Sequence, residues 1–76
     1  MKYFDLWNLS TGNLVADSDS ENDLLAFVSE MVQAHGSGAA DSWSLGWGDD
    51  KDDDARGTIA QGKDLIERAL REASVA

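Results

Sequence analysis

The chain has 76 residues, with fifteen Asp and Glu against six Lys and Arg, and a net charge of -9. This length corresponds to one domain over residues 1–76, and so short a chain buries only about 60% of the surface that it exposes when unfolded. It contains no Cys and a single His, which excludes a disulfide and a structural zinc site. The acidic balance argues against binding to nucleic acid and to anionic membranes, because both attract Lys and Arg.

Two features of hydropathy bear on location. No apolar stretch approaches the ~20 residues of a membrane span. The first seven residues lack the apolar core of an export signal, because Asp5 interrupts them. We therefore expect a cytoplasmic protein.

The N-terminal segment has the pattern of a β-hairpin. Residues 2–8 are rich in aromatic and aliphatic side chains, as strands are. Residues 10–13, Ser-Thr-Gly-Asn, are typical of a tight turn, since Gly and Asn accept positive φ. Residues 14–16 predict the returning strand.

The next segment has the pattern of an amphipathic helix. Ser20 is suited to the N-cap, and Asp23 lies in the first turn, where the helix dipole favours an acid. His35 and Gly36 are typical of a helix end. The apolar residues recur at helical spacing: Leu24, Leu25, Phe27, Val28, Met31 and Val32.

The second half repeats this order. Residues 36–41 predict a short flexible connection, and residues 43–47 predict a strand with alternating large and small side chains. Residues 49–54 are too charged to bury, so we expect a turn facing solvent. Residues 56–60 indicate a weaker strand, and a second amphipathic helix is expected from Gly62 onward.

The order β-β-α-β-β-α predicts an α+β fold. Neither hairpin can bury a face alone, so we expect one four-stranded antiparallel sheet in the order 2-1-3-4, with both helices on one face. The strand over residues 43–47 is then central. We expect Trp43, Leu45 and Trp47 to face the helices.

The opposite sheet face is the main functional lead. It would show Ser42, Ser44, Gly46 and Gly48, with Tyr3, Asp5 and Trp7 of the first strand beside them. Nothing else in the chain is expected to cover this small, flat surface, so a partner could approach closely. Tyr and Trp are also enriched at interface hot spots. The candidate interface comprises Tyr3, Asp5, Trp7, Ser44 and Gly46; the alternative is that Trp7 is merely half exposed.

Two other motifs resemble ligand sites incompletely. Residues 57–64 approach the phosphate-loop pattern, but Asp64 stands where a magnesium-binding hydroxyl is required, and the loop itself reads as a strand. Asp50, Asp52 and Asp54 match the first EF-hand ligands, yet Ala55 replaces the required Gly. We interpret the first as a strand entering a helix, and the second as a weak, unselective cation site at most.

No catalytic residue is expected. His35 has a suitable pKa for acid–base work, but nothing in the sequence places a nucleophile or carboxylate beside it. A helix-end position explains this His equally simply. No cofactor is expected either.

The chain resembles a family of small uncharacterised bacterial ββαββα domains over nearly its whole length. The motifs that carry this resemblance are Thr11-Gly12-Asn13-Leu14, Ser44-Leu45-Gly46-Trp47-Gly48-Asp49-Asp50 and Ile59-Ala60-Gln61-Gly62. The N-terminal half is also similar, more weakly, to HicB-type antitoxins, although the antitoxin's third strand before the helix is missing. The first resemblance implies the fold and no activity.

We therefore predict a small acidic, non-enzymatic protein-interaction module, whose partner is another protein or a second copy in a homodimer. It would be either a self-associating domain or a regulatory subunit. The alternative, from the net charge of -9, is an antitoxin-like or nucleic-acid-mimicking inhibitor of a basic partner.

Overall fold

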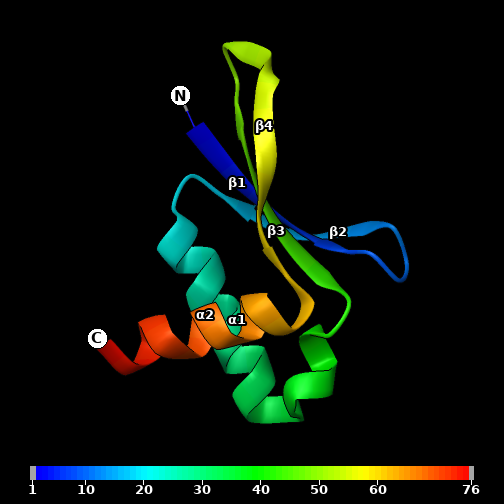
Figure 1. The fold of residues 1–76 in the computed structure, drawn as a ribbon, viewed down its shortest axis with the longest axis vertical. Helices are drawn as coiled ribbons and strands as arrows, with labels where there is room; N and C mark the ends of the chain where they lie inside the picture. Colours follow the sequence, from blue (N-terminus) through cyan, green and yellow to red (C-terminus); the bar gives the residue numbers. More distant parts are fainter. Residues whose placement is uncertain (1, 76) are drawn as a thin grey trace.

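The computed structural model describes residues 2–75, with the backbone alone for Ser37, Asp53 and residues 73–75. Its elements are β1 (Lys2–Asn8), β2 (Asn13–Ser18), α1 (Glu21–His35), the single-turn 3-10 helix η1 (Ser37–Ala40), β3 (Trp43–Asp49), β4 (Asp52–Gln61) and α2 (Gly62–Val75). The strands form one antiparallel sheet in the order β2-β1-β3-β4. Both helices pack on one face of it and against each other (Figure 1). The predicted α+β fold and strand order are confirmed.

The first hairpin closes at a turn that needs glycine. Gly12 has a φ of 74°, and its N–H donates to the Asn8 carbonyl over 2.7 Å. β2 is longer than the predicted 14–16, and a register shift lets Leu6 pair with Ala16 while Trp7 pairs with Leu14. Val15 is the extra residue of this bulge, and it packs against the core.

Both ends of α1 are those that the sequence predicts. The Asp23 N–H donates to Ser20 Oγ over 3.4 Å, which supplies one of the four hydrogen bonds that a helix start lacks. At the other end Gly36 has a φ of 90°, and its N–H donates to the Val32 carbonyl over 2.7 Å.

The connection after α1 is more ordered than we expected. Ser37–Ala40 forms one turn of 3-10 helix, and Ala40 is fully buried among the core residues. Burial of this methyl group fixes the segment, so the predicted flexible connection is wrong.

The core lies between the sheet and the two helices. Its buried members are Leu6, Leu24, Leu25, Val28, Ala40, Trp43, Leu45, Leu65, Ile66 and Ala69. Leu6 and Leu45 are directly opposite on β1 and β3, and both are fully buried. Phe27 of α1 stacks on Trp43 of β3 with ring centroids 5.9 Å apart. Each fully buried Leu contributes about 1.5–3 kcal/mol, which makes this layer the main source of stability.

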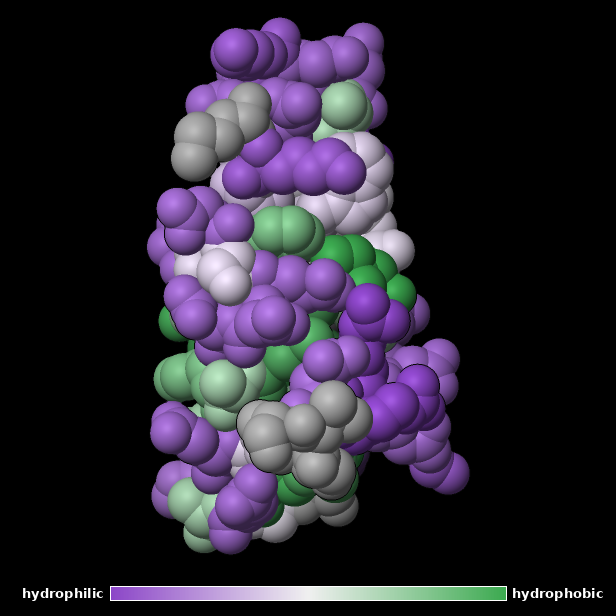
Figure 2. All heavy atoms as spheres, turned by 90° about the vertical axis from the view of Figure 1, so that its left-hand side faces the viewer, coloured by the Kyte–Doolittle hydropathy of each residue, from purple (hydrophilic) through white to green (hydrophobic). Residues whose placement is uncertain are grey.

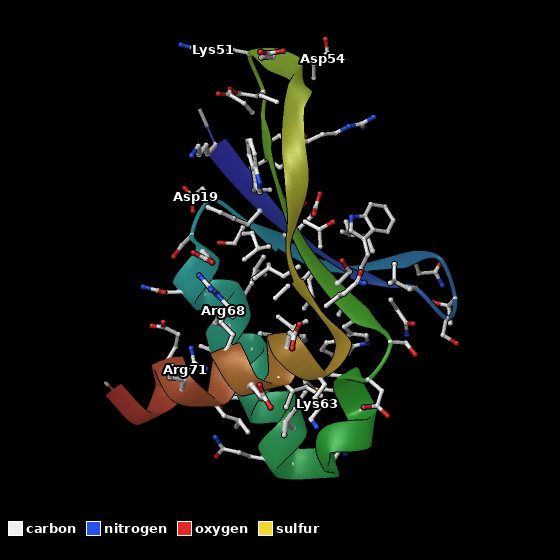
Figure 3. The ribbon with its side chains drawn as sticks, viewed as in Figure 1. Asp19, Lys51, Asp54, Lys63, Arg68 and Arg71 are labelled. Carbon is white, nitrogen blue, oxygen red and sulfur yellow. The ribbon has the colours of Figure 1, made fainter. Side chains whose placement is uncertain are left out.

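The β3–β4 hairpin extends beyond the helices (Figure 1). In Figure 2 this end of the molecule is hydrophilic, and hydrophobic residues appear further down, at the level of the helices. Lys51 and Asp54 lie at its tip (Figure 3). The predicted turn over residues 49–54 is wrong in extent, because only Asp50 and Lys51 separate β3 from β4.

The acidic residues of this hairpin organise their own backbone. Asp49 Oδ1 accepts from the Lys51 N–H over 3.0 Å, and Asp52 Oδ1 accepts from the Asp54 N–H over 3.1 Å. Such short-range bonds are typical of Asp in turns. Charges are also tolerated here because β4 is an edge strand, where they discourage pairing with another chain.

A long-range ion pair joins the two helices. Arg68 of α2 reaches α1 and donates from Nη2 to Glu21 Oε1 over 3.0 Å (Figure 3). Both side chains are partly exposed, so the pair is worth less than about 1 kcal/mol.

Candidate binding groove on the outer sheet face

The face of the sheet opposite the helices, here called the outer face, is arranged in three cross-strand rows. Residues directly opposite each other in an antiparallel pair share a face. On β1 and β3 these pairs are Tyr3 with Gly48, Asp5 with Gly46, and Trp7 with Ser44. Each row therefore joins a large or charged side chain of β1 to a small residue of β3.

The side chains of β1 lean over the small residues of β3. A Cβ atom added to Gly48 would lie 2.5 Å from the Tyr3 hydroxyl oxygen, and one added to Gly46 would lie 2.8 Å from Asp5 Oδ1. Gly48 is buried as a result. The expectation that nothing in the chain covers this small-residue face is wrong, because Tyr3 and Asp5 cover two of its positions.

The outer face consequently contains a groove instead of a flat surface. It has a volume of about 480 Å³ and lies over β3, between side chains of β1 and side chains of β4. The lining includes all five residues of the predicted interface: Tyr3, Asp5, Trp7, Ser44 and Gly46. The structure therefore brings these residues together at one place.

The sequence did not predict that residues of β4 form one side of the groove. Arg56, Gly57 and Thr58 line the groove together with Trp47. Arg56 pairs with Gly48 and Thr58 pairs with Gly46, which extends two of the rows across a third strand. The signal was present in the alternation of β4, but register shifts on both sides of this stretch cannot be read from the sequence.

Trp47 differs from the expectation that it anchors the helices. Its pairing with Phe4 gives it the register of the helix-side face, as predicted, although it also lines the groove. It is only half-buried, however, and it is not among the core residues. Its indole Nε1 lies 2.9 Å from where a Gly57 Cβ would be, and Lys2 Nζ lies 5.3 Å from its ring centroid. Of the three residues expected to face the helices, Trp43 and Leu45 are in the core and Trp47 is not.

One end of the groove is apolar. Trp7 is 40% exposed, and its partner across to β2, Leu14, is 46% exposed. Together they form an aromatic–aliphatic pair on the outer face, of the kind that stabilises neighbouring strands. Tyr3, at the other end, is 42% exposed.

The middle row carries two opposed negative charges. Asp5 pairs directly with Asp17 on β2, and like charges in such positions repel. Within residues 2–75, neither carboxylate forms an ion pair with a Lys or Arg. Arg56 belongs to the neighbouring row, with Tyr3 and Gly48. The groove thus has the Arg56 cation at its Tyr3 end and the unneutralised Asp5 carboxylate in its middle row, with Asp17 on the neighbouring strand.

The weak cation candidates do not assemble into a site. Asp50, Asp52 and Asp54 lie on the hairpin between two strands, not between the helices of an EF-hand. No group of three or more His, Cys, Asp or Glu side chains in the described part of the chain could hold a metal ion.

The remaining motifs form no further site, although Gly57 and Thr58 of the phosphate-loop-like segment line the groove. Gly57–Gln61 belongs to β4 and α2 follows at once, so the phosphate-loop-like segment contains a strand and a helix start without an intervening loop. His35 is exposed at the end of α1. A second, smaller hollow of about 220 Å³ lies between β4 and α2, lined by Ile59, Ala60, Asp64, Glu67, Arg68 and Arg71.

Among the described residues, no helix has the length and apolar character needed to cross a membrane. Comparison of the chain with protein-family models, with curated proteins and with solved structures finds no match. The resemblances to the ββαββα family and to HicB-type antitoxins therefore stay predictions.

Proposed function

We propose that this chain is a non-enzymatic protein-interaction domain of the cytoplasm, and that its outer face binds another protein. The observation that supports the proposal is the groove over β3, where two exposed aromatic side chains flank polar groups on a face that neither helix covers. Exposed Tyr and Trp around a concave surface are typical of interface hot spots.

Two physical properties of the groove fit a protein better than a small substrate. It is a shallow depression over a strand, whereas sites for small molecules usually enclose most of their ligand. Its polar groups also lie in rows at the spacing of a β-strand, which suits a partner with alternating side chains. The domain would act as a regulatory subunit or a self-associating unit.

The proposal is tested by affinity capture from cells of the source organism, using the wild type and two matched variants. Trp7→Ser removes an exposed aromatic side chain inside the groove, and Leu9→Ser removes an exposed apolar side chain outside it. We expect a partner that Leu9→Ser retains and Trp7→Ser loses. Equal recovery by both variants would count against the outer face as the binding surface.

Sedimentation equilibrium separates the two forms of the proposal. A dimer that Trp7→Ser dissociates supports self-association through the outer face. A monomer at the highest soluble concentration, together with a captured partner, supports a regulatory subunit.

The second candidate function is an inhibitor that imitates nucleic acid or an antitoxin and binds a basic protein. The net charge of -9 and the exposed acidic residues at the start of β4 favour it. Such a complex weakens steeply with salt, because its affinity comes from many exposed charges. Capture of a nuclease or DNA-binding protein, lost at high salt and insensitive to Trp7→Ser, would favour this function over the first.

A further inference from the structure

Taking the proposed interaction through the outer face as given, we infer that the groove recognises a basic side chain, Lys or Arg, of an extended partner segment. The cation would lie over the Asp5 carboxylate and against the Trp7 indole. The inference names the partner chemistry of the site described above and can fail while the interaction itself stands.

The first observation is the charge of the middle row. Asp5 and Asp17 oppose each other on neighbouring strands without a Lys or Arg in ion-pair contact among the described residues. This arrangement costs the free domain stability, since like charges opposite each other are unfavourable. A cation of the partner, placed over the Asp5 carboxylate, offsets that repulsion and gains a charge-assisted hydrogen bond.

The second observation is the aromatic group next to this charge. Trp7 is two residues after Asp5 on the same strand, so both side chains are on the outer face about 7 Å apart along β1. Trp is the side chain that attracts Lys and Arg most strongly through its π system. Leu14, exposed beside Trp7, offers an apolar surface for the methylene groups of the partner's basic side chain.

The third observation concerns the shape of the partner. Tyr3, Asp5 and Trp7 alternate along β1 over about 13 Å, at the spacing of side chains on one face of an extended peptide. Arg56 flanks the Tyr3 end, where it suits a backbone carbonyl or an acidic residue of the same segment. The basic residue is therefore placed at the middle and Trp7 end, away from Arg56.

Charge also argues against a second copy of this chain as the occupant. Two outer faces in contact would bring two sets of Asp5 and Asp17 together, on molecules that each carry a net charge of -9. The carboxylates of the two faces would repel each other, and so would the net charges of the two molecules. A basic segment of another protein has the complementary sign in both respects.

The experiment uses four acetylated and amidated heptapeptides in which Ser and Val alternate and the central residue is Lys, Arg, Glu or Leu. In each peptide the two Val side chains share a face with the central residue, which matches the rows of Tyr3, Asp5 and Trp7. Each is titrated to millimolar concentration into the isotopically labelled full chain while backbone amide and indole resonances are recorded. The Trp7 indole is assigned with a Trp7→Phe variant.

We expect the Lys and Arg peptides to shift the Trp7 indole and the amides of Asp5 and Ser44, and to bind about fivefold more tightly than the Glu and Leu peptides. A fivefold ratio is the upper end of what one exposed ion pair provides. Asp5→Asn should abolish this preference. Asp41→Asn, which removes an exposed carboxylate outside the groove, should preserve it.

Four results would overturn the inference. They are equal binding of the Leu and Lys peptides, shifts confined to residues 50–54, no shifts with any peptide, and shifts that depend on protein concentration without peptide. The last result would identify a second copy as the occupant. Suppose that Trp7→Ser still abolishes capture of a partner from cells. Any of the first three results then leaves the proposed interaction intact and contradicts only the inference that the partner presents a basic side chain.

Discussion

The two faces of β3 carry alternate residues of one short strand and are covered in different ways. Toward the helices, Trp43 and Leu45 are covered by side chains from distant parts of the chain, and both are buried in the core. Toward the outside, Gly46 and Gly48 are covered by single side chains of the adjacent strand, Asp5 and Tyr3. The first kind of cover stabilises the fold, whereas the second shapes a groove that remains open to solvent.

The largest expected effect comes from the helix side. Leu45→Ala removes a fully buried side chain and leaves a cavity between the sheet and the helices, so unfolding should become easier by about 2–5 kcal/mol. Urea denaturation followed by circular dichroism measures this change. The matched control is Leu9→Ala, at a residue that is 59% exposed, which should change stability by less than about 0.5 kcal/mol. Comparable losses for both variants would contradict the division between the two faces.

The outer face should show a smaller effect whose sign depends on its neighbour. Gly48→Ala introduces a methyl group where the Tyr3 ring lies, and displacing that ring should cost about 1 kcal/mol of stability. In a Tyr3→Ala background the space is free, and Ala should then stabilise the strand by about 0.5–1 kcal/mol relative to Gly.

A double-mutant cycle over these four proteins measures the coupling between Tyr3 and Gly48. A negligible coupling would mean that Tyr3 does not rest on Gly48 in solution. The groove would then be a flat surface, as the sequence alone suggested.

The sequence predicted the fold well because its signals are local. Ser20 and Gly36 mark the ends of α1 by their own hydrogen bonds and dihedral angles, and alternation on β1 separates Leu6 from Trp7. The five candidate interface residues follow from the same alternation combined with the strand order.

What the sequence could not predict depends on contacts between elements. The Tyr3 and Asp5 side chains lean over Gly48 and Gly46, and this conformation depends on the neighbouring strand. The contribution of Arg56 depends on the register shifts on either side of its stretch of β4, and the burial of Ala40 depends on where the core has space. Trp47 was placed on the correct face, but periodicity does not reveal that it lies outside the core.

A third prediction concerns the stability cost of the groove itself. Asp5→Asn removes the repulsion between Asp5 and Asp17, so the variant should be more stable by about 0.2–1 kcal/mol. The gain should shrink as salt is added, because exposed charges are screened. Denaturation at low and high ionic strength measures both. Asp41→Asn, remote from this pair, should show no such gain, and a loss of stability in Asp5→Asn would mean that its carboxylate stabilises the sheet.

The smallest expected effect lies near the tip of the β3–β4 hairpin, which extends beyond the helices. The hydrogen bond from the Lys51 N–H holds the pKa of the Asp49 carboxyl below its ordinary value. Because the pKa is lower in the folded than in the unfolded chain, Asp49 stabilises the fold above the unfolded pKa of about 3.9, and this contribution disappears as the pH falls through the folded value.

Asp49→Asn should therefore be slightly less stable than the wild type at pH 7, with the difference vanishing in acid. Subtracting the two urea denaturation curves at each pH cancels the titration of the other carboxylates, and Asp41→Asn provides the reference for losing one exposed charge. A difference that persists unchanged in acid would assign the effect to the amide substitution instead of the charge.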